Sequence, residues 1–274
     1  MDIKAFKMDG LGNDFVIIDE RNQNFELSKD QIIKICDRSF IGCDQLILIK
    51  KNRKIDAGLE FYNSDGSVSG ACGNGTRCVA DLLAKENNKK EIILWTSGGV
   101  LKSKILGNNL VETEIGISKN NWNEIPLSKN LDTKNLNIKI LDKDNKEHTG
   151  GTAVNVGNPH VVFFVDSIED YNLEKIGPEI ENHKFFPEKC NVTLAKVLNK
   201  NLIKVRVWER GAGLTKACGT AACATAVAGN INGLTGKKVD IEFALGKLSI
   251  SIDENNSIHM KGPVSDIKNI KIKL

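Results

Sequence analysis

The stretch GTAACATAVAG, residues 219–229, decides the fold, because the helix that it predicts is small and apolar on every face. A related stretch, GTRCVADLLAKE at residues 75–86, predicts a second helix that is apolar on most of its surface. A helix without a polar face must be buried. Most other segments predict strands, so we expect a strongly curved, mainly antiparallel sheet wrapped around each helix.

The two helices lie in two copies of one unit. EFYNSDGSVSGACG at residues 60–73 aligns with RVWERGAGLTKACG at residues 206–219, which places Cys72 opposite Cys218. GNDFVIID and GNPHVVFFVD align in the same order, as do CDQLIL and KCNVTLA, at a near-constant offset. A period this long indicates duplicated domains rather than a solenoid.

The duplication predicts an α/β fold, of mixed α+β type, with two pseudo-symmetric domains. The first copy is expected to cover residues 1–118 and to be completed by a C-terminal strand within residues 264–274. The second copy is expected to cover residues 119–263, beginning with a polar crossover segment rich in Lys and Asn.

Short β-branched runs bounded by Gly, Asn or Asp predict the strands of both copies. A helix that begins after Ser28 is also expected, because a Ser cap precedes helical apolar spacing. The expected strands cover residues 15–19, 45–50, 57–63, 91–97, 99–106 and 110–117 in the first copy, 152–158, 160–166, 191–198, 202–210, 238–244 and 246–253 in the second, and 266–274 at the C-terminus.

The composition limits the function classes. The chain has 274 residues and a net charge of +3, from 38 basic and 35 acidic residues, so it lacks the one-sided charge of a nucleic-acid surface. The N-terminus has no secretory signal, and no apolar run is long enough for a membrane span. We therefore expect a cytoplasmic protein that binds neither nucleic acid nor membranes.

Seven cysteines in such a chain are unusual. An odd number of thiols in a reducing compartment argues against a disulfide framework. There is no C-x-x-C pair and the four histidines are scattered, so no metal site is expected. Five of the cysteines are interpreted as small packing residues. The remaining two, Cys72 and Cys218, each precede a predicted buried helix.

A cysteine at the start of a helix lies beside free amide groups and the positive end of the macrodipole. Such a position can lower a thiol pKa from about 8.5 to about 3.5–7.5. The same amides can bind a carboxylate. Two thiols on opposite faces of one α-carbon are what a racemase or epimerase needs, because one removes the proton and the other replaces it. If the two domains face one another, both cysteines would serve one substrate.

The motifs NSDGSVSGACGNGTRC, NVGNPH and WERGAGLTKACGTAAC resemble those of the diaminopimelate epimerase family, and the resemblance covers nearly the whole chain. It implies an isomerase that needs no pyridoxal phosphate or other cofactor and that interconverts LL- and meso-2,6-diaminopimelate in lysine biosynthesis. It also implies a homodimer and a small-molecule substrate.

The resemblance implies roles for individual residues. Cys72 and Cys218 match the acid/base positions, and His160 and Glu209 match positions that support them. The positions that bind substrate are matched by Asn13, Gln45, Asn63, Gly73, Asn74, Asn158, Asn191, Glu209, Arg210, Gly219 and Thr220. Among these, Arg210 would pair with the distal carboxylate.

Three alternatives stay open at this point. One is another cofactor-independent racemase, acting on proline, hydroxyproline, histidine or glutamate-like substrates. Another is a thiol redox sensor in which Cys72 and Cys218 form a reversible disulfide. The third is a binding protein without catalytic activity.

Overall fold

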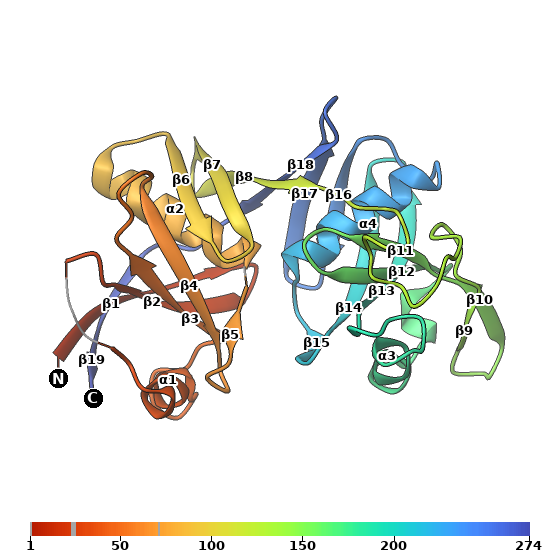
Figure 1. The fold of residues 1–274 in the computed structure, drawn as a ribbon, viewed down its shortest axis with the longest axis horizontal. Helices are drawn as coiled ribbons and strands as arrows, with labels where there is room; N and C mark the ends of the chain where they lie inside the picture. The colour runs from red at the N-terminus through yellow and green to blue at the C-terminus, as the bar shows by residue number, and fades with distance from the viewer. Residues whose placement is uncertain (1, 23–25, 71) are drawn as a thin grey trace. The chain divides into compact units, whose positions relative to one another are not determined.

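The chain folds into two compact units, which are described separately. The computed structural model describes residues 2–22, 26–70 and 72–274. Unit 1 contains the chain up to Glu114 together with Lys261–Leu274, and unit 2 contains Ile115–Met260. The chain passes from unit 1 into unit 2 within strand β8 and returns within strand β18 (Figure 1).

The elements of each unit follow in chain order. Unit 1 contains β1 (Asp2–Gly10), β2 (Asn13–Asp19), α1 (Lys29–Cys36), β3 (Gln45–Lys50), β4 (Ala57–Asn63), β5 (Val68–Ser69), α2 (Gly73–Asn87), β6 (Glu91–Thr96), β7 (Gly99–Gly107) and β19 (Lys268–Lys273). The strands at the two boundaries are β8 (Leu110–Ile117) and β18 (Ser257–Pro263).

Unit 2 has a similar order of elements. It contains β9 (Ile138–Leu141), β10 (Glu147–Gly150), β11 (Thr152–Asn155), β12 (Pro159–Phe164), the 3₁₀ helix η1 (Ile168–Asp170), α3 (Leu173–Glu181), β13 (Asn191–Asn199), β14 (Leu202–Glu209), β15 (Gly213–Thr215), α4 (Gly219–Ile231), β16 (Lys238–Phe243) and β17 (Gly246–Ile252).

Helix α2 is the central element of unit 1. It packs against β1, β2, β6 and β7, and its residues from Asn74 to Ala84 are all buried. Core residues of the strands, such as Phe15, Ile47 and Phe61, form one apolar cluster with the helix. Strands therefore surround α2 on almost every side, as its apolar sequence predicts.

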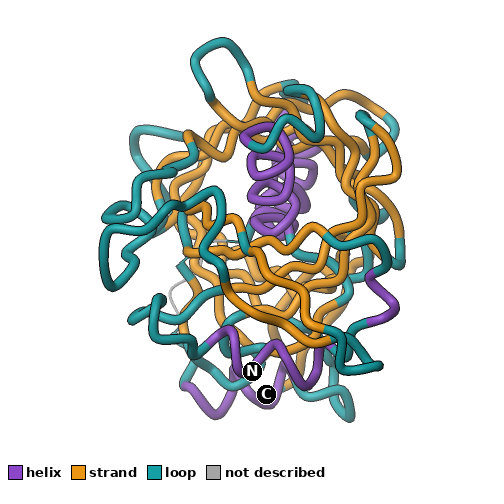
Figure 2. The backbone as a smooth tube through the Cα atoms, turned by 90° about the vertical axis from the view of Figure 1, so that its right-hand side faces the viewer, coloured by secondary structure: helices purple, strands orange, loops and turns teal. Residues whose placement is uncertain are grey.

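Helix α4 takes the same place in unit 2. Its residues from Gly219 to Gly229 are buried except Thr220, and it packs against β11, β12, β13, β16 and β17. Figure 2 shows a central helix ringed by strands. The many Ala side chains keep the helix narrow, so the strands can close around it. The predicted α/β fold with two domains is confirmed.

The strand pairing repeats between the units. In unit 1, β2 pairs in parallel with β3 and β4 with β6; in unit 2, β12 pairs in parallel with β13 and β14 with β16. Adjacent pairs such as β3–β4 and β13–β14 are antiparallel. Parallel neighbours need a crossover connection, and each of the four crossovers contains a helix. The units therefore share one topology.

The parallel strands β2 and β3 are buried on both faces along most of their length, which explains their continuous apolar runs. Alternate side chains point to opposite faces, so Phe15 and Ile17 pack with α2 while Val16 and Ile18 pack with α1. The expected Ser28 cap of α1 is confirmed as a capping box with Gln31.

The strand and helix patterns do not predict α3, η1 or the strands β1, β5, β9, β10, β15 and β18. Helix α3 contains Gly177 and Pro178, both of which lower the helix signal of a sequence. Tertiary packing outweighs them, because Ile176 and Ile180 are buried in the core against β13 and β14. The repeat could have predicted α3, since α1 occupies the equivalent crossover between β2 and β3.

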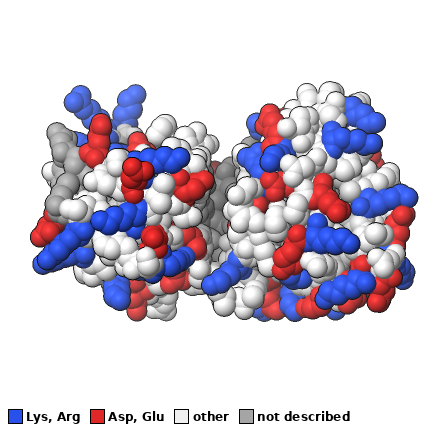
Figure 3. Space-filling model, turned by 90° about the horizontal axis from the view of Figure 1, so that it is seen from below, with Lys and Arg blue, Asp and Glu red and all other residues white. Residues whose placement is uncertain are grey.

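Charged residues of both signs are mixed on the surface, as the composition predicts. On the face drawn in Figure 3, Lys and Arg are interspersed with Asp and Glu. Within the described ranges, none of the helices combines the length and the apolar character needed to span a membrane.

Gly177 provides a test of the contact between α3 and β14. A Cβ atom built at Gly177 would lie 2.6 Å from Cγ and Cδ2 of Trp208, at the root of the indole where the ring cannot move aside. We expect Gly177→Ala to lower the free energy of unfolding by about 1–3 kcal/mol, measured by urea denaturation. Gly236→Ala is the control, because no atom lies within 4 Å of its added Cβ. Equal stability of the two variants would contradict the close packing.

Candidate active site

Cys72 of unit 1 is the N-cap of α2, as the sequence predicts. It has extended backbone dihedrals, with φ of −142° and ψ of 112°, and its sulfur accepts a hydrogen bond of 3.5 Å from the amide of Gly75. The side chain is half-buried. The amides of Gly73 and Asn74, in the first turn, have no acceptor within the helix and are suited to bind an anion.

A chain of polar side chains runs past the Cys72 sulfur. The Arg77 guanidinium donates to Asn74 Oδ1 at 2.8 Å, and Asn74 Nδ2 donates to Asn13 Oδ1 at 3.2 Å. Asn13 Nδ2 then donates to the carboxylate of Asp44 at 3.1 Å. Because the chain begins at a cation and ends at an anion, both amides are oriented the same way. The Cys72 thiol lies 3.8 Å from Asn13 Oδ1.

Gln45 and Asn63 lie at the same edge of the sheet. Strands β2 and β3 begin at Asn13 and Gln45, while the antiparallel β4 ends at Asn63, directly opposite Gln45. Gln45 Nε2 donates to Asn63 Oδ1 at 2.8 Å. The topology therefore brings the expected substrate-binding residues of the first copy to one edge.

Cys218 of unit 2 is the N-cap of α4 and has nearly the same backbone conformation as Cys72, with φ of −135° and ψ of 117°. Its side chain is only 5% exposed, and its sulfur lies 3.4 Å from the hydroxyl of Thr220. The two aligned cysteines thus share a position in the helix but differ in burial.

Burial raises the pKa of the Cys218 thiol well above its ordinary value, and the nearby negative charge of Glu209 raises it further. Hydrogen bonds from Thr220 and the Ala221 amide act in the opposite direction but are outweighed. The expectation that the helix N-terminus lowers this pKa is therefore wrong for Cys218 in this structure. The residue carries its proton at neutral pH, in hydrogen-bond contact with Glu209.

The remaining candidate residues of unit 2 lie at adjacent strand ends. His160 on β12 is paired in register with Asn191 on the parallel strand β13. Asn191 Oδ1 accepts a hydrogen bond of 3.0 Å from the amide of Arg210, just beyond the end of β14. The Arg210 guanidinium is exposed and donates to the carbonyl of Glu188 at 2.7 Å.

His160 is fully buried. Its Nε2 lies 2.9 Å from Asn158 Oδ1, which also lies in the GNPH motif. Burial and the nearby positive charge of Arg210 lower the pKa of His160 to about 3. The ring is therefore neutral at physiological pH, and Nε2 is the protonated nitrogen because Asn158 Oδ1 can only accept.

Sequence reasoning missed several residues that support these sites, including Arg77, Asp44 and Glu181. A signal for Arg77 was present, because an arginine inside a helix that must be buried requires polar partners. No comparable signal marks Glu181, which lies on the helix that the sequence patterns did not predict.

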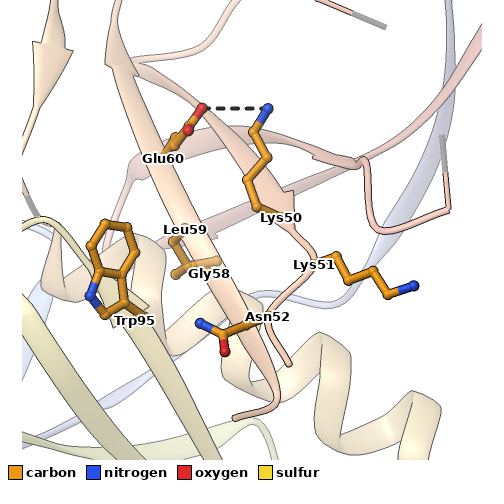
Figure 4. A pocket seen from close by; sticks show the side chains of 7 residues that line it. All are labelled: Lys50, Lys51, Asn52, Gly58, Leu59, Glu60 and Trp95. Atoms are coloured by element: carbon orange, nitrogen blue, oxygen red, sulfur yellow. Dashed lines mark ion pairs between the residues drawn. The ribbon is translucent and has the colours of Figure 1, made fainter. Parts of the chain in front are cut away.

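A surface hollow in unit 1 lies away from these residues (Figure 4). It includes Lys50, Glu60 and Trp95, and Lys50 and Glu60 form an ion pair of 3.5 Å. Lys50 ends β3, whereas Gln45 begins it, so the hollow lies at the opposite end of that strand from Gln45. It contains no cysteine and is not the candidate site.

Among the residues that the structure describes, no group of three or more His, Cys, Asp or Glu side chains could hold a metal ion. The candidate residues offer thiols, amides, the Glu209 and Asp44 carboxylates, the His160 imidazole and the Arg210 guanidinium. They can transfer protons and bind carboxylates.

Comparison with known sequences gives a consistent result. The family model for diaminopimelate epimerase matches residues 5–119 and 152–267. The diaminopimelate epimerase of Pelagibacter ubique is 78% identical over 274 residues, covering 100% of both chains. That of Acidiphilium cryptum is 41% identical over 260 residues, covering 94% of this chain and 92% of the relative.

Solved structures share the fold at low sequence identity. A hydroxyproline epimerase from Agrobacterium vitis has a TM-score of 0.69 at 12% identity, covering 98% of this chain and 91% of that one. A probable proline racemase from Agrobacterium radiobacter has a TM-score of 0.71 at 11% identity, covering 99% and 93%. These structures support the fold alone, because their sequence identity is low, whereas the family model and the sequence relatives show the family. The chain belongs to the diaminopimelate epimerase family.

Proposed function

We propose that this protein is an isomerase that epimerises LL-2,6-diaminopimelate to meso-2,6-diaminopimelate in lysine biosynthesis, using Cys72 and Cys218 as its two acid/base groups. The observation that carries the proposal is that the buried central helix of each unit begins at a cysteine N-cap. The family membership of the chain supports the substrate.

In the proposed mechanism one sulfur removes the α-proton and the other supplies a proton to the opposite face of the same carbon. Cys218, protonated and against Glu209, is suited to be the proton donor. Cys72, half-buried and within hydrogen-bond distance of both the Gly75 amide and Asn13 Oδ1, is assigned as the base in this direction. The reverse reaction exchanges the two roles.

The carbanion that forms at the α-carbon needs stabilisation without an external electron sink. We assign this role to the first-turn amides of Gly73 and Asn74 and of Gly219 and Thr220, which can bind the reacting carboxylate. Preorganised amide donors in a site without water are worth more than the same donors in solution.

The polar side chains of both units supply the specificity in this proposal. Asn13, Gln45, Asn63, Asn158, Asn191 and Arg210 are assigned to substrate binding. A second amino-acid end needs such hydrogen bonds, and a small substrate such as proline would leave these groups unpaired. Arg210 is assigned to the distal carboxylate. His160, neutral and buried, is assigned to support of the site.

Two further features belong to the proposal. We place the protein in the cytoplasm, because its odd number of cysteines suits a reducing compartment. We also propose a homodimer, from the family resemblance. Size-exclusion chromatography with light scattering would measure the oligomeric state directly.

Isotope exchange tests the reaction itself. Pure protein incubated with LL-diaminopimelate in deuterated water should produce the meso isomer with deuterium at one α-carbon, measured by NMR and chiral chromatography. No pyridoxal phosphate should be required. Proline and hydroxyproline, incubated in parallel, should show no exchange; exchange of those substrates in place of diaminopimelate would reject the proposed specificity.

Single cysteine variants test the two-base mechanism. Cys72→Ala and Cys218→Ala should each lower kcat by about 10²–10⁴-fold or more, because each removes an acid/base group. Cys72→Ser and Cys218→Ser should retain slow α-proton exchange from one face. Cys223→Ala makes the same change inside α4 and should keep activity. Equal turnover in all variants would exclude the thiols from the reaction.

The lowered pKa of His160 predicts an effect of acid on stability. The unfolded histidine binds a proton below about pH 6.5, but the folded one binds it only near pH 3. The stability contributed by neutral His160 is thus complete above pH 6.5 and is lost as the pH falls towards 3. The loss should be about 2 kcal/mol at pH 5. Urea unfolding of wild type and His160→Gln at pH 7.5 and pH 5 measures this difference, and identical pH dependence would contradict it.

A further inference from the structure

Glu181, the last residue of α3, is a buried carboxylate that accepts hydrogen bonds from a side chain near the end of β14 and from a backbone amide just beyond it. Its Oε2 accepts a hydrogen bond of 2.7 Å from the Trp208 indole, and its Oε1 accepts one of 3.2 Å from the amide of Gly211. Lys189 lies 3.7 Å from Oε1 and supplies a positive charge. The residue is only 6% exposed, so both oxygens depend on these partners.

The two donors flank Glu209 and Arg210 in the chain. Glu181 therefore holds the chain just before and just after Glu209 and Arg210, the two residues that the proposed function assigns to the site. The Trp208 ring also packs directly on Gly177 of the same helix. Helix α3 thus fixes this segment by one apolar contact and two charge-assisted hydrogen bonds.

The position of the segment matters because of what Glu209 and Arg210 contact. Glu209 acts directly on the Cys218 thiol and raises its pKa. The Arg210 amide is bonded to Asn191 at the start of β13. A shift of about 1 Å in such groups can cost about 10²-fold in rate.

We propose that Glu181 is a positioning residue, which sets the Glu209 carboxylate against the Cys218 thiol and holds Arg210 for the substrate. This inference rests on the proposed function of Glu209 and Arg210. Glu181 acts only through the Trp208–Gly211 segment and has no chemical role of its own.

The chemistry of the two donors explains why a carboxylate is needed at this position. Both oxygens of Glu181 face N–H groups, and a glutamine has only one oxygen. In Glu181→Gln, one donor would face the amide NH₂ group, which also donates, so that one hydrogen bond becomes a repulsion. The isosteric change should therefore displace the segment.

A cycle of variants tests the inference. Glu181→Gln should lower kcat/KM by about 10- to 100-fold, as expected for loss of a hydrogen bond to a charged group. The effect should appear in both kcat and KM, because Glu209 and Arg210 move together. Trp208→Phe should also lower kcat/KM, since it removes the indole donor and leaves a ring. Glu179→Gln is the control, because Glu179 is exposed on the same helix.

The double variant, Glu181→Gln with Trp208→Phe, distinguishes positioning from general stabilisation. In the double variant, the NH₂ group of the new glutamine no longer faces the indole donor, and its oxygen can still accept from the Gly211 amide. The value of kcat/KM should therefore be at least tenfold higher than the value expected by multiplying the losses of the two single variants. A residue needed only for stability would leave kcat/KM of the folded protein unchanged in all three variants. Additive losses, or unchanged kinetics in Glu181→Gln, would overturn the inference.

A second readout does not depend on turnover. Displacement of Glu209 should increase the rate at which iodoacetamide alkylates Cys218 at pH 8, measured by peptide mass spectrometry, and the double variant should reverse the increase. If wild type fails to epimerise diaminopimelate, the proposed function is rejected while this measurement still tests the positioning. An alkylation rate in Glu181→Gln equal to wild type would reject the positioning alone.

Discussion

Burial of two helices that have no polar face is the constraint on which the rest of the structure depends. Helix α4 has no polar face for water to solvate, and α2 has only a few polar side chains. Each unit must therefore surround its helix with strands. The start of each helix then lies at the edge of the sheet, where Asn13 and Gln45 in unit 1 and Asn191 in unit 2 begin their strands. The architecture thereby supplies helix amides, a cysteine and strand-end polar groups in each unit.

Duplication gives both cysteines the same place but not the same electrostatic environment. The helix macrodipole contributes about 0.3–1 kcal/mol in exposed sites and up to about 2 kcal/mol in partly buried ones. Removing a charge from water costs several kcal/mol. At buried Cys218 the second effect dominates, and Glu209 adds to it, so the thiol stays protonated. Cys72 is half-buried and takes a hydrogen bond from Gly75. The two aligned thiols therefore differ in burial and in the charges around them.

The supporting residues show how buried charges are used in the two units. Arg77 orients the amides of Asn74 and Asn13 in unit 1, while Glu181 holds the segment around Glu209 in unit 2. Both charges are buried: the Arg77 guanidinium donates to Asn74, and the Glu181 carboxylate accepts two hydrogen bonds. Such groups are costly unless paired, and the pairing gives the neighbouring polar groups one defined orientation.

The sequence by itself determined the two-domain fold and its central helices, because apolar pattern and caps are local signals and the repeat appears when the chain is aligned with itself. It also indicated the N-cap cysteines and the family motifs. The repeat places a helix at α3, but only the tertiary structure shows why it is stable despite Gly177 and Pro178, since it packs against β13 and β14. Likewise, the protonation of Cys218 and His160 depends on burial and on charges brought close by folding, which no local pattern contains.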